Sequence, residues 1–483
     1  MSVDPQSPRR GILRYIAVNA SAMAVAGVVA QICFTTIEAI IARQLGQHAY
    51  GVYGSVYAMS LAAAWLVEFG MAWKLVQDGS RAPAALPGLL GTTLVLKLVF
   101  ACVVGPLMVI LLPLLGYGTE FTRVFGIFFA YAVLLVVQDS LAGVNAVRGT
   151  MHITALFQGA APVAIIICLL LAGLTSKSLV AVGLAYVLGS GLVTALWCWR
   201  TWRTERARVE LARGGEILRG SWHYGLTGVL SQVYLRIDLL LLPLLRNLEE
   251  VGLFAAADKL TDLGLKVGVL GSRVLAPILF AQSHGDRAAY GRTCKVMLRT
   301  VSLAGALACL ILAFLAEPLV VLIFGSRFRS AAAILVVLAA SLALRLMVIA
   351  LQIVLSSSDE HLRRTGALAW AIMGAGTCNV LLVPTYGAVG AAAARVVSDL
   401  INITAMLTAR DLPFRRRAAL SWLGGPPLLG ACAYVATVSL HTSLAFSVLV
   451  GASLYGLGVL ATRAVRLVEL RELLTHLRAR PST

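Results

Sequence analysis

The sequence predicts an all-α integral membrane protein with about 14 transmembrane helices. Apolar residues make up 59% of the 483 residues and charged residues only 13%, whereas a soluble domain carries about a quarter charged residues. The mean hydropathy is +0.87. Apolar runs of about 20 residues, the length that a helix needs to cross a bilayer, recur along the whole chain. Nearly all the connections between them are short, so we expect no globular domain on either face of the membrane.

The apolar runs place the expected helices in order. The first six predicted helices cover 14–42, 50–76, 88–114, 120–144, 151–173 and 178–199, and the next six cover 218–245, 250–281, 295–324, 330–356, 364–383 and 387–409. Two more follow at 418–438 and 442–463. The predicted division is an N-terminal lobe of residues 1–205, a C-terminal lobe of residues 206–412, and a third part, residues 413–483, with the two extra helices and a tail.

Lysine and arginine are distributed unevenly between the predicted loops. With the N-terminus inside, 26 of the 40 lie in cytoplasmic segments and only six lie outside. Both termini are therefore expected in the cytoplasm, and the two six-helix halves share one orientation, as in transporters built from parallel repeats. This one-sided distribution accounts for the net charge of +18, so we expect no nucleic-acid partner. The one longer connection, Arg200–Arg219, is basic and is expected to form a short amphipathic helix on the membrane surface.

Charged residues inside apolar helices are the main functional signal, because a charge at membrane depth normally faces a protein interior or a wet cavity. In the predicted helix 250–281, five charged residues fall within an arc of about 100°. They are Asp258, Lys259, Asp262, Lys266 and Arg273. Two interpretations remain open for this stripe: it lines a polar cavity, or it forms an ion-pair ladder inside the protein, for which Asp262 and Lys266 have suitable spacing.

The helix 50–76 ends in a second charged cluster. Lys74, Asp78 and Arg81 share an arc of about 60° at its cytoplasmic end, and Glu68 lies deeper. This cluster either serves the substrate path or consists of side chains that extend to the membrane surface.

The helix 218–245 contributes one cation and one acid. Arg236 lies nearest its predicted bilayer centre, and Asp238 points about 160° away from it. Arg236 is the strongest single candidate for substrate binding. The alternative is a structural role, in which it pairs with Glu38 or Glu68.

Five acids are candidates for carrying a coupling ion, H⁺ or Na⁺. Glu38, near the outer end of the first helix, lies on the same helix face as Gln31 and Thr35. The alternative is that it is an acid at the membrane interface without a role in transport. The other four are Glu68, Asp238, Asp258 and Asp262. Lys97 and Arg345 are interpreted as lone cations that extend to the surface, and Arg395 and Asp399 as an i,i+4 pair.

Signatures of enzymes and metal sites do not occur in the sequence. It has no G-x-S-x-G, P-loop or H-E-x-x-H motif, its seven histidines are dispersed, and its eight cysteines form no C-x-x-C pair. We therefore expect no enzymatic activity, no metal and no cofactor. Transport would have to be driven by an ion gradient or by consumption of the product.

Five stretches follow one another in a characteristic order. They are ARQLGQHAYGVYGSVYAMS (42–60), EFGMAWKLVQDGSR (68–81), RIDLLLL with EEVGLFAAADKL (236–260), EPLVVLIFGSRFRSAAAILVVLA (317–339) and NVLLVPTYGAVGAAAA (379–394). Together they resemble the polysaccharide flippases of the MOP exporter superfamily, which are related to the lipid II flippases and the MATE multidrug exporters. The ordered set is specific for the family and not for its substrate.

The resemblance implies two six-helix lobes around a central cavity that opens alternately to each side of the bacterial inner membrane. The implied substrate is a polyprenyl-diphosphate-linked oligosaccharide that is turned outward for surface polysaccharide assembly, and the implied partners are a polysaccharide polymerase and chain-length machinery. A diphosphate needs cations, and Arg and Lys bind phosphate oxygens strongly. The candidates are Arg236, Lys74, Lys266 and Arg273.

Two other transporter functions remain as alternatives. A lipid II flippase is less favoured, because the lipid II branch carries a more arginine-rich first helix and the first helix here lacks a central cation. A MATE-like drug/cation antiporter is also less favoured, because a cavity for cationic drugs should be rich in acids and the stripe here has an excess of cations. A membrane-bound enzyme would be expected to carry catalytic carboxylates on a large outer loop, and no such loop is predicted.

Overall fold

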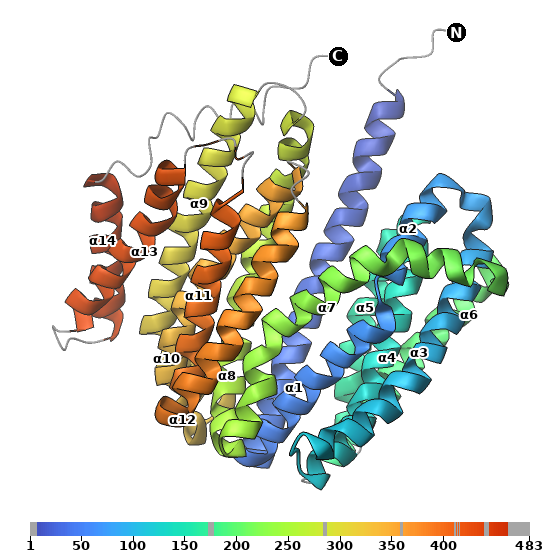
Figure 1. The fold of residues 1–483 in the computed structure, drawn as a ribbon, viewed down its shortest axis with the longest axis horizontal. Coiled ribbons are helices and arrows are strands. Elements are labelled where there is room, and N and C mark those ends of the chain that lie inside the picture. The colour runs from blue at the N-terminus through green and yellow to red at the C-terminus, as the bar shows by residue number, and fades with distance from the viewer. Residues whose placement is uncertain are drawn as a thin grey trace. The chain divides into compact units, whose positions relative to one another are not determined.

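The structure, a computed structural model, describes residues 7–171, 178–283, 287–357, 361–409, 412, 414, 416–438 and 444–461. These residues form α-helices and short 3-10 helices, without a strand among them (Figure 1). By their contacts they group into two compact units, residues 1–244 (the first unit) and 245–483 (the second unit). The predicted boundary at 205/206 separates two repeats of six helices. Grouping by contacts does not test such a repeat, so this boundary stays a prediction.

The first unit contains the elements from α1 to α7. They are α1 (Ser7–Glu68), α2 (Met71–Arg81), η1 (Pro83–Ala85), α3 (Leu86–Leu114), α4 (Thr119–Arg148), α5 (Met151–Leu171), α6 (Leu179–Glu205), η2 (Leu211–Arg213) and α7 (Gly214–Leu245). The helix α4 is central in this unit, because it contacts α1, α2, α3, α5 and α6. The polar residues of α4 therefore face protein on several sides.

The first helix, α1, is a hairpin of two arms. Gly46, with φ 79° and ψ −177°, interrupts its helical geometry, and such a positive φ is open mainly to glycine. Tyr50 and Tyr53 on the second arm both donate hydrogen bonds to Glu38 on the first. In one straight helix, residues 12 positions apart would lie about 18 Å from each other, so the chain must reverse direction at Gly46. The two arms correspond to the predicted helices 14–42 and 50–76.

The second arm does not continue to residue 76, because the helix breaks at Phe69 and Gly70. Both have positive φ angles, 39° and 76°. The Glu68 carboxylate accepts the backbone N–H of Ala72 at 2.7 Å and so satisfies one unpaired donor at the start of α2. A Cβ on Gly70 would lie 2.6 Å from the backbone nitrogen of Gly225 in α7. The break therefore lies where α7 crosses the chain at backbone contact.

The helix α7 is fixed to the first unit at several points. Ile217 packs in a buried cluster with Met71 and Leu89. Near the other end of α7, the hydroxyl of Tyr117, in the α3–α4 connection, donates to the Leu240 carbonyl at 2.5 Å. Burial raises the pKa of Tyr117 to about 12, so this phenol keeps the proton that it donates throughout the physiological pH range.

The connection between α6 and α7 differs from the surface helix expected within Arg200–Arg219. Most of these residues belong to the ends of α6 and α7, and only 206–213 lie between them. The backbone N–H of Arg208 donates to the Pro87 carbonyl at 3.0 Å, and that of Glu210 donates to the Thr92 hydroxyl at 2.9 Å. The connection thus lies across the first turns of α3, because Gly91 leaves space there for the Arg208 backbone.

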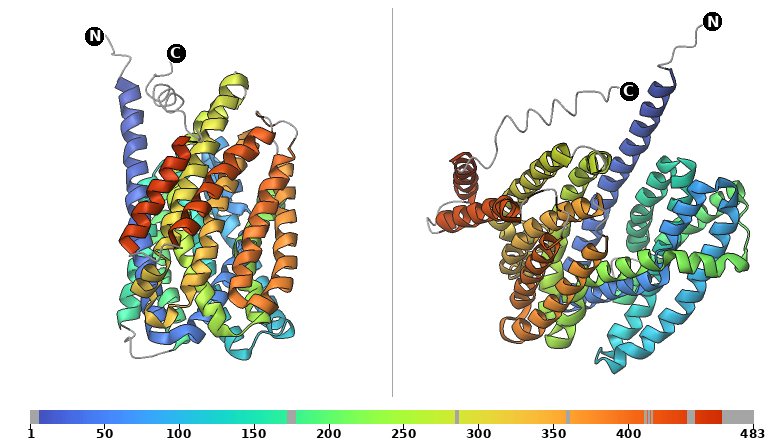
Figure 2. Two further views of the ribbon diagram at one scale, coloured as in Figure 1. Left: turned by 90° about the vertical axis from the view of Figure 1, so that its left-hand side faces the viewer. Right: turned by 45° about the horizontal axis from the view of Figure 1, so that its top comes forward.

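The second unit contains the elements from α8 to α14. They are α8 (Leu248–Ser283), α9 (Arg287–Phe314), α10 (Ala316–Phe324), η3 (Ser326–Phe328), α11 (Ala331–Ser357), α12 (His361–Leu407), α13 (Arg416–Val438) and α14 (Leu444–Ala461). The helix α11 contacts α8, α9 and α12 and forms the core of this unit. The helices α13 and α14 (red in Figure 2) both contact α9 (yellow).

The helix α12 is the second hairpin. Gly387, with φ 57° and ψ −139°, interrupts it, and the Ser398 hydroxyl on its second arm donates to the Ala371 carbonyl on its first arm at 2.7 Å. The arms correspond to the predicted helices 364–383 and 387–409. Near the turn, Arg246 donates to the carbonyls of Val383 and Pro384 at 3.0 and 2.8 Å.

The start of α8 is capped from within its own segment. The Asn247 side chain accepts the backbone N–H of Glu250 at 2.9 Å, which is the usual geometry of a helix N-cap. The Glu250 carboxylate in turn accepts the N–H of Ala388 at 3.1 Å. The two residues between α7 and α8, Arg246 and Asn247, are therefore both held by hydrogen bonds.

Nine helical stretches within the described residues are long and apolar enough to cross a membrane. Two of these stretches, Ser21–Arg81 and Arg363–Leu407, include the hairpins. The chain is therefore an all-helical, multi-pass membrane protein. The total of 14 spans stays a prediction.

Candidate functional site

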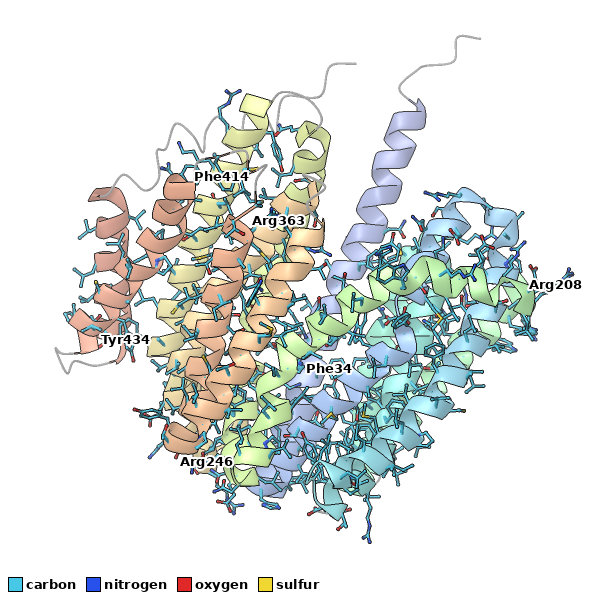
Figure 3. All side chains as sticks on the ribbon, in the orientation of Figure 1. Phe34, Arg208, Arg246, Arg363, Phe414 and Tyr434 are labelled. Atoms are coloured by element: carbon cyan, nitrogen blue, oxygen red, sulfur yellow. The ribbon has the colours of Figure 1, made fainter. Side chains whose placement is uncertain are left out.

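The first unit contains a half-open cavity between α1, α4 and α5, with several polar side chains in a mainly apolar wall. Its volume is about 340 Å³. The wall includes Phe34, labelled in Figure 3, and a group of polar and aromatic side chains. These are Trp65, Glu68, Tyr131, Gln138, Asp139 and Gln158. A cavity with two carboxylates and two amides can hold water or a small cation in the middle of an otherwise apolar helix bundle.

Asp139 on α4 is the most accessible acid of this cavity. Its side chain is exposed and lines the cavity wall, and it accepts no hydrogen bond from any residue that the structure describes. The neighbouring Gln138 is instead fixed, because it donates to Ser190 and Thr194 of α6 at 3.1 and 2.8 Å. Asp139 was not among the predicted acids, although it too is a charged residue within an apolar helix, which is the property that singled out the others.

Glu68 of α1 also lines the cavity and is ion-paired with Lys97 of α3. The two residues are 3% and 1% exposed. The Lys97 ammonium also donates to the Val136 carbonyl at 3.0 Å and to the Ser140 hydroxyl at 2.5 Å, so it is held at several points inside the protein. The interpretation of Lys97 as a lone cation that extends to the surface was wrong.

Glu38 lies in a cluster of tyrosines. It accepts the hydroxyls of Tyr50 and Tyr53 at 2.6 and 3.1 Å, and the Tyr53 hydroxyl lies 2.8 Å from that of Tyr186 on α6. The Tyr186 ring is 4.9 Å from that of Tyr131, which lines the cavity. Glu38 is 4% exposed. It is thus a buried acid connected to the cavity through aromatic side chains.

The charged stripe of α8 is divided by the structure. Asp258, which is 1% exposed, pairs with Arg395 of α12, whose guanidinium lies 4.9 Å above the Phe254 ring. Lys266 is exposed, and Lys259 and Asp262 are half-buried. The side chain of Arg273 lies outside the part of the chain that the structure describes. One end of the stripe is therefore a dry ion pair, and its central part is accessible.

A second buried pair lies beside the first. Asp399 accepts the Ser341 hydroxyl at 2.5 Å and lies 3.5 Å from the guanidinium of Arg345. Arg345 is only 4% exposed, so its interpretation as a lone cation that extends to the surface was also wrong. The sequence predicted that Arg395 and Asp399 pair along α12, and the structure gives each of them a partner on another helix.

The remaining candidates lie near α7. The Lys74 ammonium donates to Asp78 at 2.8 Å with side chains that are 15% and 23% exposed, and the Lys74 side chain rests over Gly220. Arg236 is half-buried, and Asp238, half a turn further along α7, is fully buried. Lys74 and Arg236 are thus the two candidate cations of the first unit that water can reach.

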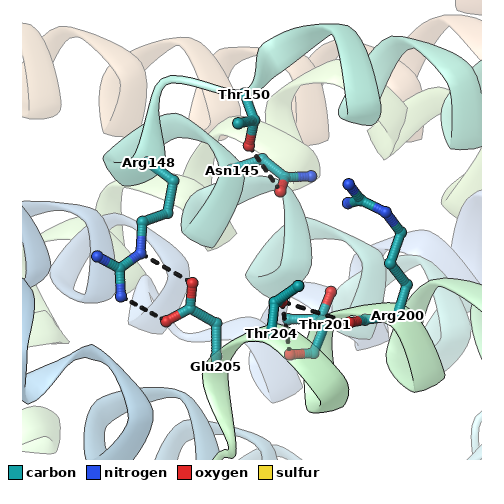
Figure 4. Close-up of polar contacts among 7 residues, drawn as sticks. All are labelled: Asn145, Arg148, Thr150, Arg200, Thr201, Thr204 and Glu205. Atoms are coloured by element: carbon teal, nitrogen blue, oxygen red, sulfur yellow. Dashed lines mark hydrogen bonds and ion pairs between the residues drawn. The ribbon is translucent and has the colours of Figure 1, made fainter.

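One further charged cluster lies at the ends of α4 and α6 (Figure 4). The Arg148 guanidinium binds the Glu205 carboxylate through two parallel hydrogen bonds of 2.8 and 2.6 Å. Paired hydrogen bonds of this kind are strong and directional. Thr204 in the same turn donates to the backbone carbonyls of Arg200 and Thr201. The cluster holds the two helix ends together and is structural.

Solved structures with a similar fold are transporters. The lipid II flippase MurJ in its inward closed conformation has a TM-score of 0.75 and 13% identity, over 91% of this chain and 98% of its own. An inward-facing multidrug resistance MATE family transporter of the MOP superfamily has a TM-score of 0.64 and 16% identity, and the match covers 82% of this chain and 96% of that transporter. The MATE transporter VcmN of Vibrio cholerae in its bent form has a TM-score of 0.56 and 15% identity, and the match covers 86% of this chain and 100% of that transporter. At these identities the likeness concerns the fold.

The sequence itself matches one family. No curated protein matches the chain significantly. A family model described as polysaccharide biosynthesis protein matches residues 13–283, which is more than half of the chain. The chain therefore belongs to the polysaccharide biosynthesis protein family, and its fold is that of the MOP superfamily.

Proposed function

We propose that the chain is a flippase that moves polyprenyl-diphosphate-linked oligosaccharide units from the cytoplasmic to the outer leaflet of the bacterial inner membrane. The family match and the fold of a lipid II flippase support this proposal. In it, 14 helices form two six-helix lobes around a central cavity and two additional helices, both termini are cytoplasmic, and alternating access turns the head group outward. The exported unit then passes to a polymerase and its chain-length machinery.

The observation that carries the proposal is the separation of buried from accessible cations. The buried lysine and arginines of the described chain, Lys97, Arg345 and Arg395, each lie against a carboxylate. The proposed phosphate-binding cations are the accessible ones: Lys266 is exposed, and Arg236 is half-buried. A cation near the low-dielectric interior that water can still reach is suited to bind a diphosphate as it enters.

Removal of these cations is expected to reduce export. Arg236→Ala and Lys266→Ala should each lower it about tenfold to a hundredfold, because a hydrogen bond to a charged group contributes about 1.5–3 kcal/mol. The readout is surface polysaccharide in a strain without its own copy of the gene, normalised to protein abundance. Lys74→Ala tests the third candidate in the same assay.

The control is Arg329→Ala. Arg329 is an exposed arginine in the α10–α11 connection that pairs with Glu317 of α10. This substitution should leave export unchanged. If Arg236→Ala and Lys266→Ala both export at the wild-type level with normal abundance, the phosphate-binding role is wrong.

We further propose that a coupling ion, H⁺ or Na⁺, binds in the cavity of the first unit. Of the predicted acids, Glu68 lines this cavity and Glu38 adjoins it through the tyrosines. Asp139 joins them as the accessible carboxylate. Asp258 is less suited, because its ion pair with Arg395 is dry. The buried Asp238 and the half-buried Asp262 remain candidates.

Loss of the Asp139 charge is expected to uncouple transport. In proteoliposomes, flipping by the wild type should increase with an imposed proton or sodium gradient, and Asp139→Asn should abolish this increase. Glu120→Gln, at an exposed position in the first turn of the same helix, should retain the response. Wild-type flipping that ignores both gradients would remove the coupling role from all of these acids.

The same vesicles distinguish the alternative substrates. They can be supplied with lipid II or with a cationic drug in place of the oligosaccharide lipid. The flippase proposal predicts that the oligosaccharide lipid is moved faster than either of them.

A further inference from the structure

The two arms of α12 border a groove at the end of the hairpin that is remote from Gly387. The groove has a volume of about 580 Å³ and lies wholly within the second unit. Its walls include Arg363 (labelled in Figure 3), Gly366 and Trp370 on the first arm, and Ile401, Thr404 and Thr408 on the second. It is separate from the cavity of the first unit and from the charged residues of α8.

The groove is polar at one end and apolar at the other. Arg363 lies at its mouth and donates to the Thr408 carbonyl of the opposite arm at 3.4 Å. The Thr404 hydroxyl lies one turn deeper, and Ile401 and Trp370 line the inner end. A guanidinium carries a permanent positive charge and several N–H donors in one plane, which suits it to bind a phosphate.

The lining residues of the groove fit within the depth of one leaflet of a bilayer. The seven residue steps from Arg363 to Trp370 span about 10 Å of helix, and the hydrocarbon layer of a single leaflet is about 15 Å thick. Trp370 is 61% exposed, on a helix that is long and apolar enough to cross the membrane. A groove in such a surface lies against the lipid, and the charged end of the helix lies at the level of the head groups.

The charge around the mouth favours an anionic head group. Arg364 follows Arg363 directly, so two cations lie in succession at this end of the first arm. Basic clusters next to a membrane helix attract anionic lipids. We propose that the groove is a binding site for an anionic phospholipid, with its phosphate at Arg363 and one acyl chain along the groove to Trp370.

This site does not depend on the proposed transport function, since it needs only a chain that spans the membrane. A phospholipid is the proposed occupant because its phosphate and its acyl chain match the basic end and the apolar end of the groove, and the test below separates it from a polyprenyl lipid. Bound there, the lipid would hold the two arms of α12 together at the end where the Gly387 turn does not connect them.

The test is lipid binding by the purified, detergent-solubilised protein. Dioleoyl phosphatidylglycerol is added at increasing concentration, and bound lipid is counted by native mass spectrometry alongside the thermal unfolding midpoint. We expect saturable binding that raises the midpoint, at least fivefold tighter than that of dioleoyl phosphatidylcholine. Arg363→Gln should weaken the binding at least fivefold.

Arg364→Gln is the matched control. It removes the same charge from the next residue, whose side chain donates to Ser356 at 2.8 Å and does not line the groove. The affinity of the Arg364→Gln variant for dioleoyl phosphatidylglycerol should stay within twofold of that of the wild type. An equal loss for both variants would mean unspecific attraction to a basic surface and would overturn the proposal.

A second variant tests the position of the acyl chain. A Cβ at Gly366 meets no atom within 4 Å, so Gly366→Leu fills the groove without disturbing the helix. It should weaken the binding of dioleoyl phosphatidylglycerol and leave that of water-soluble glycerol phosphate unchanged. Unaltered lipid binding in Gly366→Leu, or tighter binding of undecaprenyl phosphate than of phosphatidylglycerol, would show that the groove is not a phospholipid site.

Discussion

Lys97→Met is expected to destabilise the protein by about 3–5 kcal/mol, which is the usual cost of removing one partner from a buried ion pair. Glu68 and Lys97 are almost completely buried, so the substitution would leave the Glu68 carboxylate without its cation. The Val136 carbonyl and the Ser140 hydroxyl would lose their donor as well. The measurement is the free energy of unfolding in detergent.

The double variant Lys97→Met/Glu68→Gln provides the decisive comparison. Replacement of both charges removes the unpaired carboxylate, and stability should return to within about 1–2 kcal/mol of the wild type. Arg329→Met, in an exposed pair with Glu317, should cost less than about 1 kcal/mol. A Lys97→Met variant as stable as Arg329→Met would contradict the assigned ion pair.

Gly225→Ala is expected to cost about 1–3 kcal/mol, although alanine normally favours a helix over glycine. The added Cβ would lie 2.7 Å from the Phe69 carbonyl oxygen and 2.9 Å from its carbon. These are backbone atoms, so the contact can be relieved only by moving α7 away from the break between α1 and α2. The same unfolding measurement applies.

Gly215→Ala separates this steric effect from helix propensity. Gly215 lies in the same helix, and a Cβ there meets no atom within 4 Å. This substitution should be neutral or mildly stabilising. If Gly225→Ala matches it, the close approach of α7 at Phe69 and Gly70 is not a constraint on the fold.

The sequence could predict the helices that membrane length alone determines. The apolar runs predicted both arms of α1 and of α12, because a span of about 20 residues and a short polar connection leave little choice. The turns at Gly46 and Gly387 lie within the predicted connections or at their edges. The charge rule also selected Glu38, Glu68 and Asp258, all of which are buried polar positions.

The pairing of these charges could not be predicted, because it depends on how each helix is rotated and on its height in the membrane. A shift of one residue turns a side chain by about 100°, and predicted boundaries are uncertain by more than that. The pairs of Lys97 with Glu68 and of Asp258 with Arg395 connect different helices. The break at Phe69 could not be predicted either, because it depends on contact with another helix, α7.

The two residues that connect α7 to α8 have a mechanical consequence. Arg246 is anchored to the Val383 and Pro384 carbonyls, and Asn247 caps α8, so both residues are held to the second unit. Any force on this segment is therefore carried within the second unit, by the first turn of α8 and by the turn of the α12 hairpin.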